Sequence, residues 1–389
     1  MKYLLLLFIP GIVFCQNKTS GIIIDDTTKT PINTVSIFNQ IDRTTTNEDG
    51  YFVFTSNLDS LTISKLGYKE IKLTFGELNA DTIFLSPKEI ILLDEATIVN
   101  YPNLLRNVYL NVIKNYPHTS FVDKFFLRTI LKRDNKIYRF EDTQGKIKRN
   151  SLFLSSDVKS LKFDFQILNQ RKSGLLYKDR NIEDFDFHSL KELFDWVSTV
   201  FIDLKCFTFQ YENIDENQVK VFFTPLPDFK NKNIGYYVID KRDYSITEYF
   251  SKTNPDFQNE IRFIEKQGIR FRTINAELHI RFSKNNQTKK YCISDATLNQ
   301  KTEVFGRNNE KIYYDVIYQL ANVQNFNNEN FKPNVKNSKR LFEINYDYDE
   351  QFWENQNQLL LTDELQSFID SSQADSKEFK SISNLKKKK

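Results

Sequence analysis

Residues 19–85 consist of short runs in which apolar and polar side chains alternate, separated by residues that favour turns. The clearest turn, Asn47-Glu48-Asp49-Gly50, leads straight into the run Tyr51-Phe52-Val53-Phe54. Such alternation of aromatic and β-branched residues is typical of half-buried strands. Further runs of this kind cover 21–25, 34–38, 42–46, 61–64, 66–69, 71–75 and 82–85. Their close spacing predicts a small antiparallel β-sandwich over residues 19–86.

The rest of the chain predicts a larger α+β domain over residues 103–370, after a linker at 87–102. A helix is expected from Asn103 to just before Pro117, and the capping box of Ser189 and Glu192 predicts another. Thr362 is expected to cap a third, short helix. Alternating runs predict strands at 161–165, 207–211, 219–223, 236–240, 261–264 and 276–282, with a hairpin that joins 235–240 to 243–246. The fold class is therefore mainly β, with a large curved antiparallel sheet and a few helices.

The two ends of the chain differ from the domains between them. Lys2, an apolar run over 4–14 and the polar residues from Gln16 are typical of a secretory signal peptide at 1–15; a membrane span needs about 20 apolar residues. Cleavage before Gln16 is favoured over lipidation of Cys15, because the bulky Phe14 precedes that cysteine. No transmembrane helix is expected after cleavage. Residues 371–389 are polar, end in four lysines and predict a disordered basic tail.

The N-terminal pattern resembles a known family. The residues that carry the resemblance are Gly21, Asp25, Pro31, Val35, Thr46, Asp49-Gly50-Tyr51-Phe52, Ile63-Ser64, Gly67-Tyr68 and Leu93-Asp94-Glu95-Ala96. They are similar to the carboxypeptidase-regulatory-like domain, a transthyretin-like β-sandwich common in exported proteins of Bacteroidetes-type bacteria and at the front of their TonB-dependent transporters. The resemblance covers most of residues 19–98 and implies a place in the periplasm or at the outer membrane. It implies nothing catalytic, since in peptidases this domain is an accessory.

The composition bears on the packing of the chain, on the class of its partners and on its cysteines. The chain is 40% hydrophobic with 35 Phe and 19 Tyr, which is ample material for packed cores. A net charge of +3 gives no indication of a nucleic-acid partner. Cys206 and Cys292 remain after cleavage, and they can form a disulfide or stay as two free thiols; we favour free thiols.

Candidate chemistry is sparse. None of His118, His188 and His279 has a glutamate three residues later, so the carboxypeptidase zinc motif is missing, and structural roles are expected for these histidines. Nucleophile-elbow and phosphate-loop motifs are also missing from the sequence.

Two groups of acidic residues are candidates for a site. Asn345, Asp347 and Asp349 share one face if they lie in a strand, where they could hold calcium or form a solvated acidic edge, and the second is favoured. Asp184 and Asp186 could be the paired carboxylates of a glycosidase. Pairs at such spacing are common, so we assign no catalytic, cofactor-binding or metal-ligating residue and expect no cofactor.

The leading hypothesis is an exported, non-enzymatic protein of the cell envelope. In it the sandwich is an adaptor, and the larger domain binds an envelope protein such as a TonB-dependent transporter, or a carbohydrate or peptide ligand. The alternatives are a carboxylate-dependent, glycosidase-like hydrolase without a local motif, and an outer-membrane β-barrel behind a periplasmic sandwich.

Overall fold

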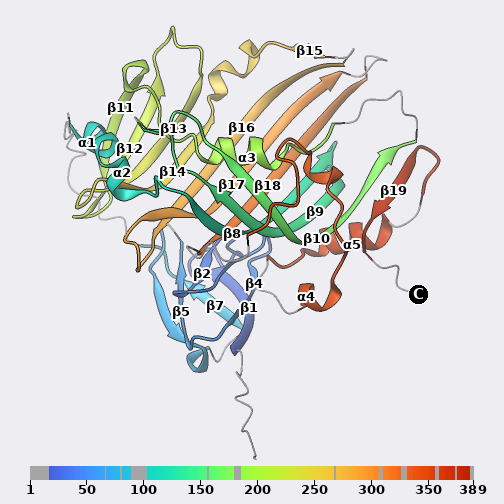
Figure 1. Cartoon of the computed structure of the whole chain (residues 1–389), viewed down its shortest axis with the longest axis horizontal. Helices are drawn as coiled ribbons and strands as arrows, with labels where there is room; N and C mark the ends of the chain where they lie inside the picture. Colours follow the sequence, from blue (N-terminus) through green and yellow to red (C-terminus); the bar gives the residue numbers. More distant parts are fainter. Residues whose placement is uncertain are drawn as a thin grey trace, which may run out of the picture. The chain divides into compact units, whose positions relative to one another are not determined.

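The structure is a computed structural model of the chain, drawn in Figure 1. It describes residues 17–65, 67–78, 81–88, 103–155, 157–178, 185–266, 269–305, 310–325, 331–354, 359–372 and 375–385. The segment expected to be a signal peptide, residues 89–102 of the expected linker and the final four lysines lie outside the described residues. The chain forms two compact units: unit 1 contains 1–89 and 356–360, and unit 2 contains 90–355 and 361–389.

Unit 1 is built from two small sheets that enclose a common core. Strands β1 (Asn17–Asp25), β4 (Tyr51–Ser56) and β7 (Thr82–Leu85) form a sheet in the order β4-β1-β7. Strands β2 (Ser36–Phe38), β3 (Arg43–Thr45), β5 (Ser60–Ser64) and β6 (Ile71–Thr74) form the other in the order β3-β2-β5-β6. The core residues that are 2% exposed or less are Ile23, Val35, Ile37, Phe52, Phe54, Leu61, Ile63 and Leu85.

Unit 1 departs from the predicted pattern at two points. Strand β7 pairs parallel with β1, because the chain passes through the 3-10 helix η1 (Phe75–Glu77) after β6 and enters the other sheet beside β1. In the run noted at 66–69, the described residues Gly67–Lys69 are not a strand: Gly67 has φ +85°, and Tyr68 makes only an isolated bridge to Pro87. The other predicted strands of this unit are present, so the sandwich is mainly rather than wholly antiparallel.

The turn before β4 forms as predicted. The side chain of Asn47 accepts hydrogen bonds from the backbone amides of Asp49 at 3.1 Å and Tyr51 at 2.8 Å. Gly50 has φ +78°, and a Cβ atom there would lie 2.8 Å from the carbonyl oxygen of Ile23. Glycine is needed at this position both for the left-handed backbone and for the close approach of β1.

Unit 2 is organised around one twelve-stranded sheet. The strands follow the order β11-β12-β13-β14-β16-β17-β18-β8-β9-β10-β19, and β15 pairs with β16 off this path. All of the pairs are antiparallel, and the predicted hairpin is formed by β13 and β14. The strands are β8 (Phe121–Arg133), β9 (Lys136–Arg149), β10 (Phe163–Tyr177), β11 (Phe207–Asn213), β12 (Gln218–Pro225), β13 (Asn233–Asp240), β14 (Ser245–Thr253), β15 (Ile264–Lys266), β16 (Ile269–Lys284), β17 (Tyr291–Phe305), β18 (Lys311–Asn325) and β19 (Phe379–Ser383).

Short helices accompany this sheet. They are α1 (Leu104–Leu110), α2 (Val112–Asn115), α3 (Leu190–Val197), α4 (Glu350–Glu354) and α5 (Asp363–Ser371), with 3-10 turns η2 (Leu204–Cys206), η3 (Pro255–Glu260) and η4 (Leu341–Glu343). The helix expected before Pro117 is divided at Asn111. The predicted capping box of Ser189 and Glu192 is present, and Thr362 caps α5. None of the described helices meets the length and hydropathy needed to cross a membrane.

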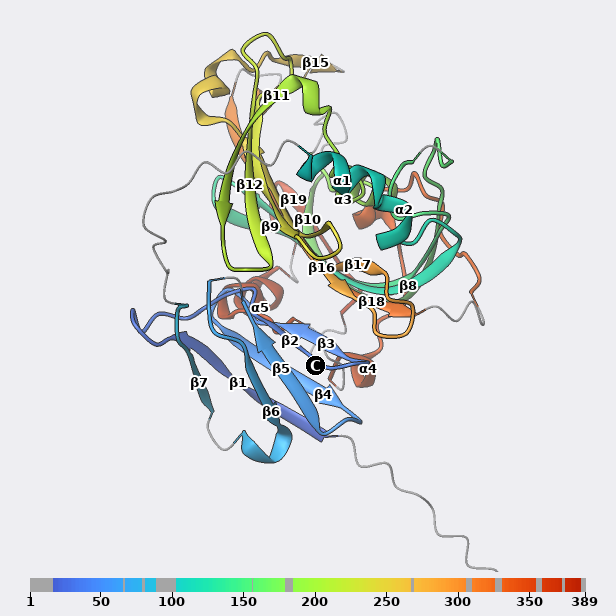
Figure 2. The same cartoon turned by 90° about the vertical axis from the view of Figure 1, so that its left-hand side faces the viewer.

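The main core of unit 2 lies on one face of the sheet, which we call the inner face. Apolar residues of α1 and α3 pack into this core, and Figure 2 shows these helices together beside the curved sheet. At β8 and β9 the opposite, outer face is buried as well, because Leu365 and Ile369 of α5 pack against Ile130 and Phe140. Strands β8 and β9 are thus covered on both faces, and any charge on them must be paired inside the protein.

The expected disorder of the C-terminal tail is wrong for residues 375–385. Strand β19 pairs with residues 173–177 of β10, and the side chain of Asn384 binds the backbone of Lys172 and Gln170. The partner is the edge of β10, whose backbone groups need hydrogen bonds. A polar composition read locally does not reveal such a partner.

We predict that Gly50→Ala destabilises unit 1 by about 2–4 kcal/mol, because it combines backbone strain with a clash against a backbone oxygen. Gly67→Ala, which has φ +85° but nothing within 4 Å of the new Cβ, measures the strain alone. Gly76→Ala, which meets nothing within 4 Å, is the control. Urea unfolding followed by hydrogen exchange of the β1 and β4 amides should rank the losses as Gly50, Gly67, Gly76; equal stability of the first and last variants contradicts the account.

Candidate functional site

The outer face of strands β12, β13, β14 and β16 carries a row of aromatic side chains. Cross-strand register places Phe222 opposite Tyr236, Tyr236 opposite Phe250, and Phe250 opposite His279. These four residues are partly exposed, whereas the residues that alternate with them on the strands belong to the inner core. Together with Lys220 and Glu248 they form what we call the Tyr236 group.

Glu248 holds the Tyr236 group in one arrangement. Its side chain is 6% exposed, and its Oε1 atom accepts hydrogen bonds from the Tyr236 hydroxyl at 2.7 Å and from His279 Nε2 at 2.9 Å. Because an ionised carboxylate only accepts hydrogen bonds, the His279 proton lies on Nε2. Burial, and next the charge of Glu248, raises the pKa of Tyr236, so its hydroxyl remains a donor.

The rings of this group pack against one another in two orientations: Tyr236 stacks on Phe250, whereas Phe222 and His279 lie edge-to-face with their neighbours. Tyr236 and Phe250 stack with centroids 5.3 Å apart and planes 24° apart, while Lys220 Nζ lies 4.0 Å from the centroid of the Tyr236 ring. Since β12 and β14 flank β13 on opposite sides, both faces of the Tyr236 ring are occupied within the protein. The group therefore combines partly exposed aromatic rings with a cation and an imidazole.

The histidines noted in the sequence lie in separate places. His188 binds the hydroxyl of Tyr318 through its backbone amide at 2.9 Å and its Nδ1 at 2.8 Å, and burial lowers the pKa of His188. His118 Nδ1 is buried with no hydrogen-bond partner among the described residues. His279 alone of the three belongs to the Tyr236 group.

The acidic residues noted in the sequence do not share a face as supposed. Residues 344–349 are not a strand, so the premise for Asn345, Asp347 and Asp349 is wrong. Asn345 Oδ1 accepts a hydrogen bond from Lys172 at 2.9 Å, and Asp349 Oδ1 accepts one from the amide of Phe352 at the start of α4. Within the described residues, no three His, Cys, Asp or Glu side chains gather as metal ligands.

Of the two carboxylates considered for a glycosidase, the structure describes only Asp186. Asp184 lies outside the described residues, and Asp186 forms an ion pair with Arg139 at 2.8 Å. Arg139 is buried and also donates to the carbonyl oxygen of Phe185 at 3.1 Å. Asp186 therefore attaches its loop to β9. Cys206 and Cys292 are both free thiols, and Cys292 is buried.

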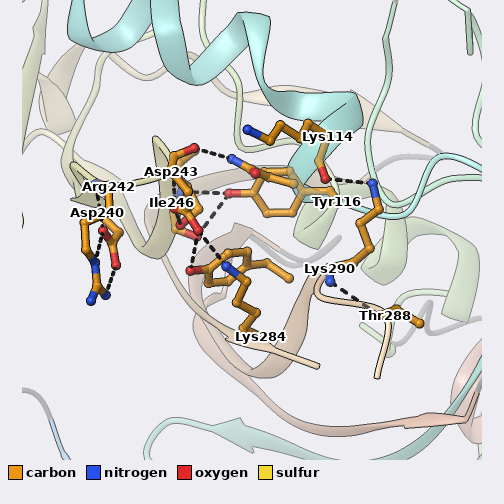
Figure 3. A network of polar contacts seen from close by, with 12 residues as sticks. Lys114, Tyr116, Asp240, Arg242, Asp243, Ile246, Lys284, Thr288 and Lys290 are labelled. Atoms are coloured by element: carbon orange, nitrogen blue, oxygen red, sulfur yellow. Dashed lines mark hydrogen bonds and ion pairs between the residues drawn. The ribbon is translucent and has the colours of Figure 1, made fainter. Parts of the chain in front are cut away.

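A second polar network lies where α2 meets two hairpin turns (Figure 3). Asp243 accepts hydrogen bonds from Lys284 Nζ at 2.8 Å, the Ser245 hydroxyl at 2.6 Å and the Tyr291 hydroxyl at 3.0 Å. Burial acts to raise the pKa of Asp243, but these hydrogen bonds outweigh it and the net pKa is lowered. Asp243 thus joins the turn after β13 to the strands on either side of the 285–290 turn.

The same network attaches α2 to the sheet, as Figure 3 shows. The Tyr116 hydroxyl donates to the carbonyl oxygen of Ile246 at 3.1 Å and accepts from its amide at 2.7 Å. Lys290 Nζ donates to the carbonyl oxygens of Ile113 and Lys114 at the end of α2. Because these charged groups are engaged with one another and with backbone, we interpret the network as structural.

A third polar cluster lies inside unit 2, around Glu141 on β9. Glu141 is 0% exposed, and its Oε1 accepts hydrogen bonds from Thr143 at 2.7 Å and Gln170 at 3.0 Å. Burial raises the pKa of Glu141 to about 7, although the charge of nearby Lys172 opposes the shift. Lys172 is itself buried, which lowers its pKa, and it donates to the carbonyl oxygens of Phe342 and Ile344.

Of these assemblies, the Tyr236 group is the one that combines a row of partly exposed aromatic side chains with a buried carboxylate that binds two of its members. Sequence reasoning identified its strands and His279 but did not group them, because Glu248, Tyr236 and His279 meet only through the pairing of three strands. The alternation of Lys220, Phe222 and Phe250 with core residues is the one sequence signal that points to this face.

Comparisons with known proteins name no relative. No protein-family model matches the chain, and no curated protein does either. Among solved structures, a lipovitellin structure concerned with lipid–protein interactions is 5% identical over 58% of this chain and 27% of its own, with a TM-score of 0.22. The outer membrane protein OprD of Pseudomonas aeruginosa is 8% identical over 55% of this chain and 96% of its own, with a TM-score of 0.14. Likenesses this slight carry no argument about function.

We predict that Glu141 makes stability depend on pH. Its pKa of about 7 in the folded protein exceeds the ordinary 4.5, so folding binds a proton between these values, and stability falls as pH rises from 4.5 to 7. Glu141→Gln should therefore be the more stable protein at pH 8, by up to about 3 kcal/mol, and differ little at pH 5. Urea unfolding at both pH values measures this, with exposed Glu212→Gln as the control. Parallel pH profiles of the wild type and Glu141→Gln contradict it.

Proposed function

We propose that the chain is an exported, non-enzymatic protein of the cell envelope, and that the Tyr236 group is the surface through which unit 2 binds a partner protein. One observation carries the second part: a partly exposed aromatic row is held rigidly by a buried carboxylate. Aromatic residues are enriched at protein interfaces, and a prearranged surface loses little conformational entropy on binding.

The geometry of the rings favours a protein over a carbohydrate as the partner. Stacking on a sugar needs an open ring face, and the faces of Tyr236 are taken by Phe250 and Lys220. The partly exposed rings, together with the Lys220 ammonium and the His279 imidazole, suit the carbonyl, carboxylate and aromatic groups of a protein surface. A peptide ligand would meet the same groups.

Export rests on the sequence pattern at 1–15 and on the resemblance of residues 19–98 to a regulatory-like domain of envelope proteins. The two-sheet arrangement of unit 1 is compatible with that resemblance. We therefore assign a binding role to both units in this proposal.

Export predicts a particular mature N-terminus. The protein purified from its native host should begin at Gln16, as pyroglutamate, and should fractionate with the periplasm or the outer membrane. Mass spectrometry of the N-terminal peptide measures this. A diacylated Cys15 corrects the anchoring but keeps the export, whereas an intact Met1 in the cytoplasmic fraction contradicts the proposal.

If a partner protein binds the aromatic row, a large charged side chain placed in that row should abolish the binding. Phe222→Arg should reduce the set of envelope proteins cross-linked to the wild type at least tenfold, because an arginine there disrupts the aromatic row. Tyr313→Arg is the matched control, since Tyr313 is a partly exposed aromatic on the same face of the sheet but on β18. Quantitative mass spectrometry after cross-linking measures both. Equal recovery with the two variants, each folded by circular dichroism, contradicts the assignment of this face.

A further inference from the structure

Three polar side chains meet inside unit 2 on the adjacent strands β18, β8 and β9. Asp123, Arg149 and Asn322 are 0%, 1% and 2% exposed. Arg149 Nη2 donates to Asp123 Oδ2 at 2.6 Å, and Asn322 Nδ2 donates to the same oxygen at 3.2 Å. The Arg149 guanidinium lies between the rings of Phe121 and Phe194, 5.2 Å and 5.5 Å from their centroids.

The direct contacts of this cluster leave part of its hydrogen-bonding capacity unused. Arg149 Nε and Nη1, Asp123 Oδ1 and Asn322 Oδ1 are buried and have no hydrogen-bond partner among the described residues. Two of these atoms are donors and two are acceptors. They come from three strands that neighbour one another, so they belong to one place in the core.

Four unpaired polar atoms in one place carry a large energetic cost. Each buried group without a hydrogen bond destabilises the folded state, and four such groups together are a large cost against the small net stability of a typical domain. Most buried polar atoms in native proteins are paired with protein or with ordered water. This cluster therefore needs a ligand that both donates and accepts hydrogen bonds.

We propose that Asp123, Arg149 and Asn322 form a binding site for internal water, occupied by one or two molecules. A water molecule accepts from Arg149 Nε or Nη1 and donates to Asp123 Oδ1 and Asn322 Oδ1. This matches the roughly three hydrogen bonds that buried waters make in proteins. The waters complete the link between β18, β8 and β9 that the direct ion pair makes only in part.

Charge and burial select water over an ion. The single positive charge of Arg149 is balanced by the single negative charge of Asp123, so a bound ion would add an uncompensated charge to the core. The walls contributed by Phe121 and Phe194 are apolar and buried. A small neutral molecule with both hydrogen-bonding roles is what the chemistry admits.

A crystal structure of the full chain at about 1.5 Å resolution tests the site directly. We expect density for one or two waters within hydrogen-bonding distance of Arg149 Nε or Nη1 and of at least one of the two acceptor oxygens. A rearranged cluster in which these atoms bond one another directly, with no density between them, overturns the proposal. Density for an ion or an organic molecule overturns it as well.

Magnetic relaxation dispersion of water oxygen tests the site in solution, by counting long-lived internal waters. Replacing the three residues together, Asp123→Leu, Arg149→Met and Asn322→Leu, should lower that count by one or two. The matched control is the outer-face triple of Arg128→Met, Asp142→Leu and Arg171→Met, in which both arginines donate directly to Asp142. Equal counts in a folded inner-face triple and in the wild type contradict the proposal; if that triple does not fold, the wild-type crystal decides.

Discussion

The large sheet depends on the pairing of charges within strands β8, β9 and β10, which are covered on both faces. On the outer face, Asp142 lies between Arg128 and Arg171, with ion-pair distances of 2.8 Å and 2.7 Å. The Trp353 ring of α4 lies 4.7 Å from the Arg171 guanidinium. A buried charge that lacks a partner costs several kcal/mol, so these strands are stable only in the register that joins the three side chains. Register also fixes which residues face the core.

Buried charges on the inner face are subject to the same constraint, but there they are stabilised in a different way. Glu141 and Lys172 are cross-strand neighbours, and burial shifts the pKa of each towards its neutral form. Lys172 donates to backbone oxygens of the 342–344 segment, so one buried amine attaches a distant part of the chain to β10. Buried polar groups of this kind favour one arrangement of loops over others, because each alternative arrangement leaves a donor unpaired.

The strands β12 to β16 differ from β8, β9 and β10 because their outer face is partly exposed. There a buried carboxylate, Glu248, orients side chains that reach solvent instead of fastening a helix. Its hydrogen bonds to Tyr236 and His279 limit the rotamers of both, and stacking of Phe250 on Tyr236 limits them further. Rigidity in a surface aromatic cluster reduces the entropy lost on binding. For this reason this face supports the proposed function better than the polar network around Asp243 does.

The sequence by itself determined the local structure: the Asn47–Gly50 turn, the strands of unit 1, the β13–β14 hairpin and the capping box at Ser189. These features depend on residues close in the chain, through turn chemistry, capping and alternation. Tertiary structure alone decided the parallel pairing of β7, the order of the tail in β19, and the meeting of Glu248 with His279. Each of these depends on hydrogen bonds or ion pairs between strands distant in sequence, and no local pattern encodes which strand edge or which register supplies the partner.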